Sequence, residues 1–353
     1  MTQRHTLAVI GGDGIGPEVV GEALKVLDAV EAVYHPGIVV EQLPWGAEHY
    51  LKTGITIPPE EMQRLGRDVS AILVGALGDS RVPDNVHARD ILLGMRFQLD
   101  LYVNERPARL FDDRLTPLKG KTVRDFDLVV FRENTEGLYV SVGGAFKVGT
   151  PDEITIAEEL NTRKGVERII RHAFAWARAH GKTRVTMADK ANAIAAHGLW
   201  RRVFEEVGAE YADITRDTRY IDAMAMDLVR TPEAFQVIVT GNLFGDIISD
   251  LASILVGGLG IAPSANRHPG RVTMYEPVHG SAPPLAGKDI ANPMAAILSL
   301  AMMLEGVGDA DAGAAVERAV RAAISAGVGT PDIGGTLGTR AVGDWIAARV
   351  RAG

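Results

Sequence analysis

Short strand-length runs rich in apolar residues alternate with amphipathic segments along most of the chain. The strand-like runs lie at 7–10, 38–42, 71–74, 128–131, 184–187, 211–215 and 237–239. Segments with apolar residues at helical spacing lie at 19–30, 59–65, 87–99, 162–180, 200–207, 220–228 and 243–255. Because strands that alternate with helices are typical of βαβ units, the pattern predicts an α/β protein with a largely parallel core sheet.

Three stretches depart from this alternation. Residues 143–158 show no clear period, and we interpret them as an excursion with strand character that clasps a second subunit. Glycine and proline predict loops at 257–266 and 274–293. Two helices are expected to close the chain, and the first of them begins after Asn292-Pro293, a helix-start signal.

The segment 236–263 carries the clearest chemical signal. Its strand and tight turn lead into the helix at 243–255, where Asp246 and Asp250 stand four residues apart on one face, about 5–6 Å between their Cβ atoms. Their neighbours are expected to be buried: Ile247, Ile248, Leu251 and Ile254. Buried carboxylates are costly unless they are paired, so the two aspartates suggest a shared Mg²⁺ or Mn²⁺. Spacing alone supports a solvated helix face equally well.

Composition excludes several classes of protein. The 353 residues, 46% of them hydrophobic, suffice for two domains. A net charge of −8 argues against nucleic acid or an anionic membrane as partner. Without cysteine there is no disulfide, thiolate zinc site or cysteine nucleophile, which fits a cytoplasmic protein. The strand-like start predicts no signal peptide, and the longest apolar stretch, 294–304, is too short to span a bilayer.

A glycine-rich turn follows the first strand but does not match the dinucleotide fingerprint. The turn reads GGDGIGPE from Gly11 to Glu18, and Pro17 occupies the place that the third glycine of a Rossmann motif needs. We therefore do not predict a Rossmann crevice.

Basic residues near the ends of predicted strands and helices suggest an anionic substrate. Arg96, Arg106 and Arg132 are suited to hold carboxylates in bidentate fashion, although each alone fits a surface ion pair. Lys190, just after a strand, is a candidate base if its pKa is lowered, the alternative being a solvated lysine. Tyr139 is a candidate proton donor, although most tyrosines only pack.

Six motifs carry a resemblance to a known family over essentially the whole chain. They read LDLYVNERP, RENTEGLYV, DKAN, GNLFGDIISDLAS, EPVHGSAP and GKDIANP, in this order, between GDGIGPE and TPDIGG. In these motifs the chain resembles the β-decarboxylating 3-hydroxyacid dehydrogenases. The resemblance implies two α/β domains that share a central, largely parallel sheet, an isocitrate/isopropylmalate dehydrogenase-like fold and not a Rossmann fold. It also implies residues 1–102 with 258–353 as the first domain, and 103–257 as the second.

The resemblance assigns roles to the candidate residues. Asp246 and Asp250, with Asp222 from the other subunit of a homodimer, match the ligands of Mg²⁺ or Mn²⁺. Lys190, also from the partner, matches the base, and Tyr139 matches the acid. The three arginines match the groups that bind the substrate's carboxylates. Because two residues would cross between subunits, we expect a homodimer, either alone or assembled into a tetramer.

The cofactor expected from the resemblance is NAD. The matching positions are Asn192, Glu276, His279, Gly280, Ser281, Ala282, Leu285 and Asn292. NAD-linked members usually carry an acidic residue where this chain has Pro284, while NADP-linked members carry lysine and tyrosine at 284 and 285. Neither group that would meet a 2′-phosphate is present, so we predict NAD.

Substrate choice within the family depends on the helix at 87–99. Leu92 and Leu93 stand where an apolar branch on C3 would be received, which favours 3-isopropylmalate and a role in leucine biosynthesis. RENTEG is closer to homoisocitrate and tartrate enzymes, and Arg89 would suit a third carboxylate, so homoisocitrate, isocitrate, tartrate and D-malate remain alternatives. Oxidation without decarboxylation and a catalytically silent regulatory subunit are further alternatives.

Overall fold

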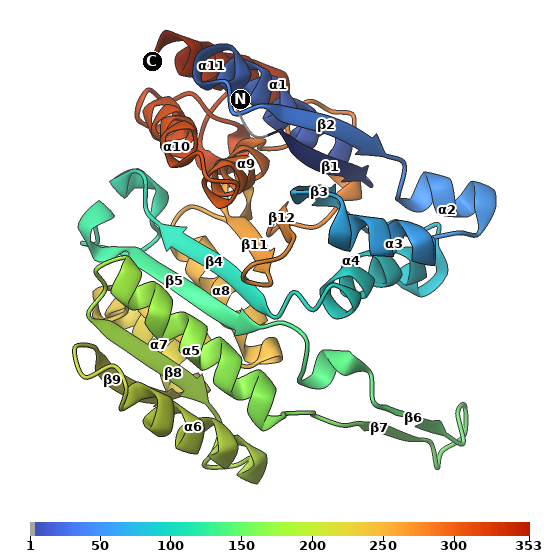
Figure 1. Cartoon of the computed structure of the whole chain (residues 1–353), viewed down its shortest axis with the longest axis vertical. Coiled ribbons are helices and arrows are strands. Elements are labelled where there is room, and N and C mark those ends of the chain that lie inside the picture. The colour runs from blue at the N-terminus through green and yellow to red at the C-terminus, as the bar shows by residue number, and fades with distance from the viewer. Residues whose placement is uncertain (1–3) are drawn as a thin grey trace.

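A single ten-stranded mixed sheet runs through the computed structural model, which describes residues 4–353 (Figure 1). The strand order is β2-β1-β3-β12-β11-β4-β5-β10-β8-β9, and six of its nine neighbouring pairs are parallel. The antiparallel pairs surround β4 and β11, in the middle of the sheet. The strands are β1 (His5–Gly12), β2 (Ile38–Leu43), β3 (Ala71–Ala76), β4 (Val103–Arg109), β5 (Asp127–Glu133), β8 (Arg184–Asp189), β9 (Thr215–Tyr220), β10 (Val237–Thr240), β11 (Pro263–Arg267) and β12 (Thr273–Pro277).

Helices cover both faces of the sheet because successive strand residues point to opposite sides. In β5, Val129 and Phe131 pack with α5 and α6, whereas Leu128 and Val130 pack with α7 and α8. In β1, Leu7 and Val9 contact the core of α1 and α9. The helices are α1 (Gly16–Tyr34), α2 (Ala47–Thr53), α3 (Pro59–Arg67), α4 (Val86–Gln98), α5 (Arg163–Ala179), α6 (Gly198–Gly208), α7 (Ile221–Arg230), α8 (Asn242–Leu255), α9 (Met294–Gly306), α10 (Ala310–Ser325) and α11 (Thr339–Ala352).

The hydrophobic core consists of four clusters. Two draw mainly on residues 7–101 and 261–350, and the other two on residues 103–256. The exact domain boundaries, 1–102 with 258–353 against 103–257, stay a prediction. No helix within residues 4–353 combines the length and the apolar character that crossing a bilayer requires.

A two-stranded arm extends away from the body of the molecule (Figure 1). Its strands β6 (Gly143–Phe146) and β7 (Ile154–Ala157) pair antiparallel, which confirms the strand character expected at 143–158. Every residue of both strands is exposed, Phe146 by 64% and Ile156 by 56%. The arm therefore leaves most of its apolar surface uncovered by its own chain, and its role as a subunit clasp remains a prediction.

Several expectations about elements were wrong. The strand expected at 211–215 begins only at Thr215, because residues 211–214 form a turn in which Ile214 N–H bonds to Tyr211 O at 3.0 Å. Pro263–Arg267, expected to be loop, forms β11, and Thr273–Pro277 forms β12, so the second expected loop begins only after residue 277. Three helices, not two, close the chain, and β4 and α2 were not expected at all.

Candidate active site

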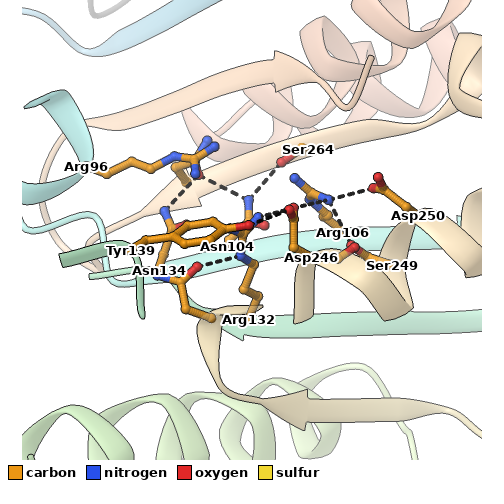
Figure 2. Close-up of polar contacts among 12 residues, drawn as sticks. Arg96, Asn104, Arg106, Arg132, Asn134, Tyr139, Asp246, Ser249, Asp250 and Ser264 are labelled. Carbon is orange, nitrogen blue, oxygen red and sulfur yellow. Dashed lines mark hydrogen bonds and ion pairs between the residues drawn. The ribbon is translucent and has the colours of Figure 1, made fainter. Parts of the chain in front are cut away.

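Three arginines from three different elements lie around one aspartate of α8, and two of them, Arg106 and Arg132, contact it. Arg96 lies in the last turn of α4, Arg106 in β4 and Arg132 near the end of β5. Figure 2 shows Arg106 and Arg132 beside Asp246, with Arg96 on the other side of Tyr139. All three arginines are buried, Arg132 with only 1% of its surface exposed. The structure thus brings together side chains that lie far apart in the sequence.

Glycine allows α8 to approach β5 closely enough for these contacts. The helix starts after Gly241, and its residue Gly245 faces Arg132, where an added Cβ would lie 2.6 Å from the arginine Cβ. Asn242, at the start of the helix, accepts a hydrogen bond from Arg132 Nε at 2.9 Å. The motif GNLFGD therefore places Asp246 within hydrogen-bonding distance of the Arg132 guanidinium group.

Asp246 interacts with three predicted site residues, Arg106, Arg132 and Tyr139. Arg132 Nη1 donates to its Oδ1 at 2.5 Å, and the Tyr139 hydroxyl donates to its Oδ2 at 2.9 Å. Arg106 Nη1 lies 3.3 Å from Oδ1 and also donates to Asp250 at 3.0 Å. Both carboxylates remain open on one side, because 33% of the Asp246 side chain and 51% of the Asp250 side chain are exposed.

The charges in this cluster change its acid–base properties. Burial disfavours the charged form of Asp246, but the neighbouring arginines and the Tyr139 hydroxyl together outweigh it, and its pKa is lowered. Burial lowers the pKa of Arg132 to about 9, with help from the other arginines. Burial and the nearby Asp246 raise the pKa of Tyr139. The cluster therefore presents positive charge to a ligand and keeps its phenol protonated.

One chain alone does not complete a metal site. Within residues 4–353, no three acidic or histidine side chains come together, and Asp246 and Asp250 supply two carboxylates only. Asp222, the third predicted ligand, instead accepts a hydrogen bond from Lys190 Nζ at 2.6 Å. This pair is exposed, by 62% for the Asp222 side chain, and no hydrogen bond or ion pair joins it to the arginine cluster among the described residues. Oxygen-only donors suit Mg²⁺ or Mn²⁺.

Two isoleucines of α8 contradict the sequence prediction. Ile248 is buried and Leu251 is partly buried, as expected, but Ile247 is 56% and Ile254 is 52% exposed. The helix therefore carries apolar side chains on the solvent side as well as beneath it, next to the two aspartates.

A buried polar network that the sequence did not predict supports Arg96. Arg96 Nη2 donates to Glu276 at 2.9 Å, and Asn266 Nδ2 donates to the same Oε1 atom at 2.8 Å. Asn266 in turn accepts from Asn104 at 3.1 Å and from Asn134 at 2.9 Å. Polar residues inside the strand segments YVNERP and PSAN were the available signal, because buried amides in a sheet need partners. Glu276, predicted to contact the cofactor, here pairs with an arginine of the substrate cluster.

Half of the predicted cofactor residues line one cavity of about 520 Å³. These four are His279, Ala282, Leu285 and Asn292. The Nε2 atom of His279 is buried without a hydrogen-bond partner among the described residues, as expected of a group that awaits a ligand. Ser281 lies beside the cavity, where its carbonyl oxygen accepts from Ile15 N–H at 2.8 Å and fastens the GGDGIGPE turn. Gly280 and Asn192 are exposed and do not line the cavity.

The candidate specificity residues lie on α4. Leu92 and Leu93 are partly buried, and Leu92 packs against the core of β1 and β3. The Arg89 side chain is 58% exposed, and its nearest carboxylate is Asp90 at 3.8 Å.

Comparisons with known proteins agree with one another. Residues 6–346 match the model of the isocitrate/isopropylmalate dehydrogenase family. A 3-isopropylmalate dehydrogenase of Nocardia farcinica is 46% identical over 98% of this chain and 99% of its own, and one of Thermobifida fusca is 45% identical over 98% and 97%. The crystal structure of isocitrate dehydrogenase from Methylococcus capsulatus superposes with a TM-score of 0.89 at 39% identity, covering 98% of this chain and 99% of that chain.

Proposed function

The chain belongs to the isocitrate/isopropylmalate dehydrogenase family, and from this premise we propose that it oxidises and decarboxylates 3-isopropylmalate with NAD and a divalent metal. The observation that carries the proposal is the contact of Arg106, Arg132 and Tyr139 with Asp246, together with the nearby charge of Arg96. Three guanidinium groups match a substrate with two carboxylates, and they lie next to two partly exposed carboxylates that could hold a metal and next to a phenol.

The arginines and the aspartates of the site have different proposed roles. The arginines bind and orient the substrate carboxylates, and their positive charge lowers the cost of bringing a dianion into a partly buried site. Asp246 and Asp250, joined by Asp222 of a second copy, would hold Mg²⁺ or Mn²⁺, which supplies Lewis-acid polarisation of the substrate oxygen on C2. The two carboxylates are partly open to solvent, as metal entry requires.

Protons are handled by Lys190 and Tyr139. Lys190 of a second copy would take the proton of the C2 hydroxyl, and bound NAD would supply the hydride acceptor. Tyr139 stays protonated, because burial and Asp246 raise its pKa, and it donates its proton to C3 after CO₂ departs. Both residues of this acid–base pair are present, which argues against a silent regulatory subunit.

The lining of the cofactor cavity supports NAD over NADP. None of the residues that line it is a lysine or arginine, within the part of the chain that the structure describes. Its one carboxylate, Asp332, accepts hydrogen bonds from Asn292 at 3.0 Å and Thr330 at 2.5 Å. A 2′-phosphate here would meet negative charge without a cation, which is unfavourable.

A homodimer is part of the proposal. Exposed apolar side chains gather on the two packed helices next to the metal ligands: Met226 and Val229 on α7, Ile247 and Ile254 on α8. A second copy that covers this surface would bury them and bring its own Lys190 and Asp222 to the site.

The test is a substrate screen with the purified protein, NAD and Mg²⁺, read as NADH formation and CO₂ release. We expect 3-isopropylmalate to give both, well ahead of isocitrate, homoisocitrate, tartrate and D-malate. Lys190→Ala and Tyr139→Phe serve as inactive controls. A tricarboxylate as the best substrate, or NADH without CO₂, would contradict the proposal. The exposed position of Arg89 is the observation against a third carboxylate.

A further inference from the structure

The backbone around Lys190 is held by hydrogen bonds on both sides, while its side chain pairs with the exposed Asp222 at 2.6 Å. The Lys190 carbonyl accepts from Ala193 N–H at 2.9 Å and from Ile194 N–H at 2.8 Å. Its N–H donates to Nδ1 of His197 at 3.0 Å. One residue earlier, Asp189 accepts from Arg201 Nε at 2.7 Å. The geometry of the lysine's main chain is therefore set by neighbours in the same chain.

His197 is fixed in one tautomer by these contacts. Its side chain is buried, with 4% exposed, and packs edge-on against Phe244. Because Nδ1 accepts from a backbone N–H, the ring proton must be on Nε2, which faces the two oxygens of Glu159 at 2.9 and 3.1 Å. The imidazole thus connects the Glu159 carboxylate to the Lys190 main chain.

Glu159 lies at the base of the exposed arm. The arm base is closed by Gly137 and Leu160, whose main chains exchange hydrogen bonds at 2.7 and 3.3 Å, and Tyr139 follows two residues after Gly137. Asn161 Nδ2 donates to Glu159 at 3.1 Å and adds a second restraint. The carboxylate that orients His197 is therefore anchored where the arm leaves the body.

We propose that His197 is a positioning residue for Lys190, oriented by Glu159 at the arm base. This role rests on the proposed function, in which Lys190 is the base. The imidazole touches neither substrate nor cofactor. It holds the main chain from which Lys190 projects, so that the amine reaches the hydroxyl of a substrate bound by a second copy. Displacement of a catalytic group by about 1 Å can cost on the order of 100-fold in rate.

Two isosteric substitutions separate the two halves of this contact. In His197→Asn the amide oxygen occupies the position of Nδ1 and still accepts from Lys190 N–H. In His197→Gln the amide reaches the position of Nε2 and meets Glu159, but the acceptor for Lys190 is lost. A cavity of about 90 Å³, lined in part by His197, Glu159 and Trp200, leaves room for either side chain.

We expect His197→Asn to keep kcat for 3-isopropylmalate within about threefold of wild type, and His197→Gln to lower it by about 10–100-fold with KM nearly unchanged. Melting temperatures check that both variants fold. Glu159→Ala should also lower kcat, and Glu159→Gln, which still accepts from Nε2, should restore it. If His197→Gln does not fold, the comparison of Glu159→Ala with Glu159→Gln tests the positioning role instead.

Two results would overturn the proposal. The first is an equal kcat for His197→Asn and His197→Gln, or for Glu159→Ala and Glu159→Gln, while Lys190→Ala is inactive. This result would exclude the positioning role of His197 and leave the proposed function intact. The second is full activity of Lys190→Ala. It would overturn the positioning role and the proposed function together, because Lys190 would then not be the base.

Discussion

Asp246 is the proposed metal ligand with the closest cationic neighbours. Its charge is balanced by Arg132 and Arg106, which lie 2.5 and 3.3 Å away. We predict that Asp246→Asn weakens Mn²⁺ affinity by at least about tenfold, because the neutral amide is a poor ligand beside two cations. Titration of the purified variant with Mn²⁺, followed by NADH formation, measures this. Asp213→Asn, an exposed aspartate paired with Arg178, is the matched control. Full activity of Asp246→Asn in chelator would refute the assignment.

Arg89 and Arg96 lie on the same helix but have opposite environments. The Arg89 side chain is 58% exposed, whereas that of Arg96 is 9% exposed and bonded to Glu276. Arg89→Ala should therefore cost less than about 1 kcal/mol in kcat/KM for 3-isopropylmalate, the range of exposed ion pairs. Arg96→Ala should cost about 3 kcal/mol or more, since it removes the charged partner of a substrate carboxylate in a buried site. Steady-state measurements of kcat/KM for the two variants test this difference. A loss for Arg89→Ala as large as that for Arg96→Ala would show that Arg89 contacts the substrate.

At the scale of the element, α5 packs on β5 through a histidine that resists protonation. The His172 ring meets Phe131 edge-on at 5.0 Å, its Nε2 is buried without a partner among the described residues, and burial lowers its pKa to about 4. The unfolded chain takes up this proton near pH 6.5, so His172 makes the folded protein progressively less stable as the pH falls from 6.5 to 4.

His172→Phe should remove this acid-side loss. We expect urea unfolding at pH 5 and pH 8 to show wild type losing about 1–2 kcal/mol more than the variant on going to the lower pH. Above pH 7 both states of the wild type hold His172 neutral, so the difference between the proteins should be independent of pH there. Parallel pH dependence of the two proteins down to pH 4 would disprove the interpretation.

At the scale of the whole molecule, the site of one chain is incomplete. Lys190 and Asp222 form an exposed pair without a contact to the arginine cluster among the described residues. If each copy completes its neighbour's site, mixing the inactive variants Lys190→Ala and Asp246→Asn should restore activity, because a mixed dimer contains one site with both residues intact.

Random assortment would give at most about a quarter of the wild-type activity in this mixture. The measurement is NADH formation after subunit exchange, with mass spectrometry to show that mixed dimers are present. Each variant incubated alone is the control. An inactive mixture that contains mixed dimers would exclude sites shared between subunits.

The sequence alone determined most of the elements and the choice of candidate site residues. Apolar runs such as 128–131 and 237–239 became central strands, because a strand buried on both faces reads as a continuous apolar run. The motifs around Asp246, Lys190 and Tyr139 predicted the reacting groups through the family resemblance they carry, and these roles stay predictions.

Tertiary structure decided what these residues contact. The polar strand β4 does not look like a strand, yet it lies mid-sheet because Asn104 and Glu105 find partners in Ser264, Asn266 and Arg267. Ile247 and Ile254 have the apolar character of core residues, but α8 offers that side to solvent. Likewise, seven residues separate Lys190 from His197 in the chain, and only the turn after β8 brings the imidazole to the lysine main chain. Such partners depend on how the chain packs, which local periodicity does not specify.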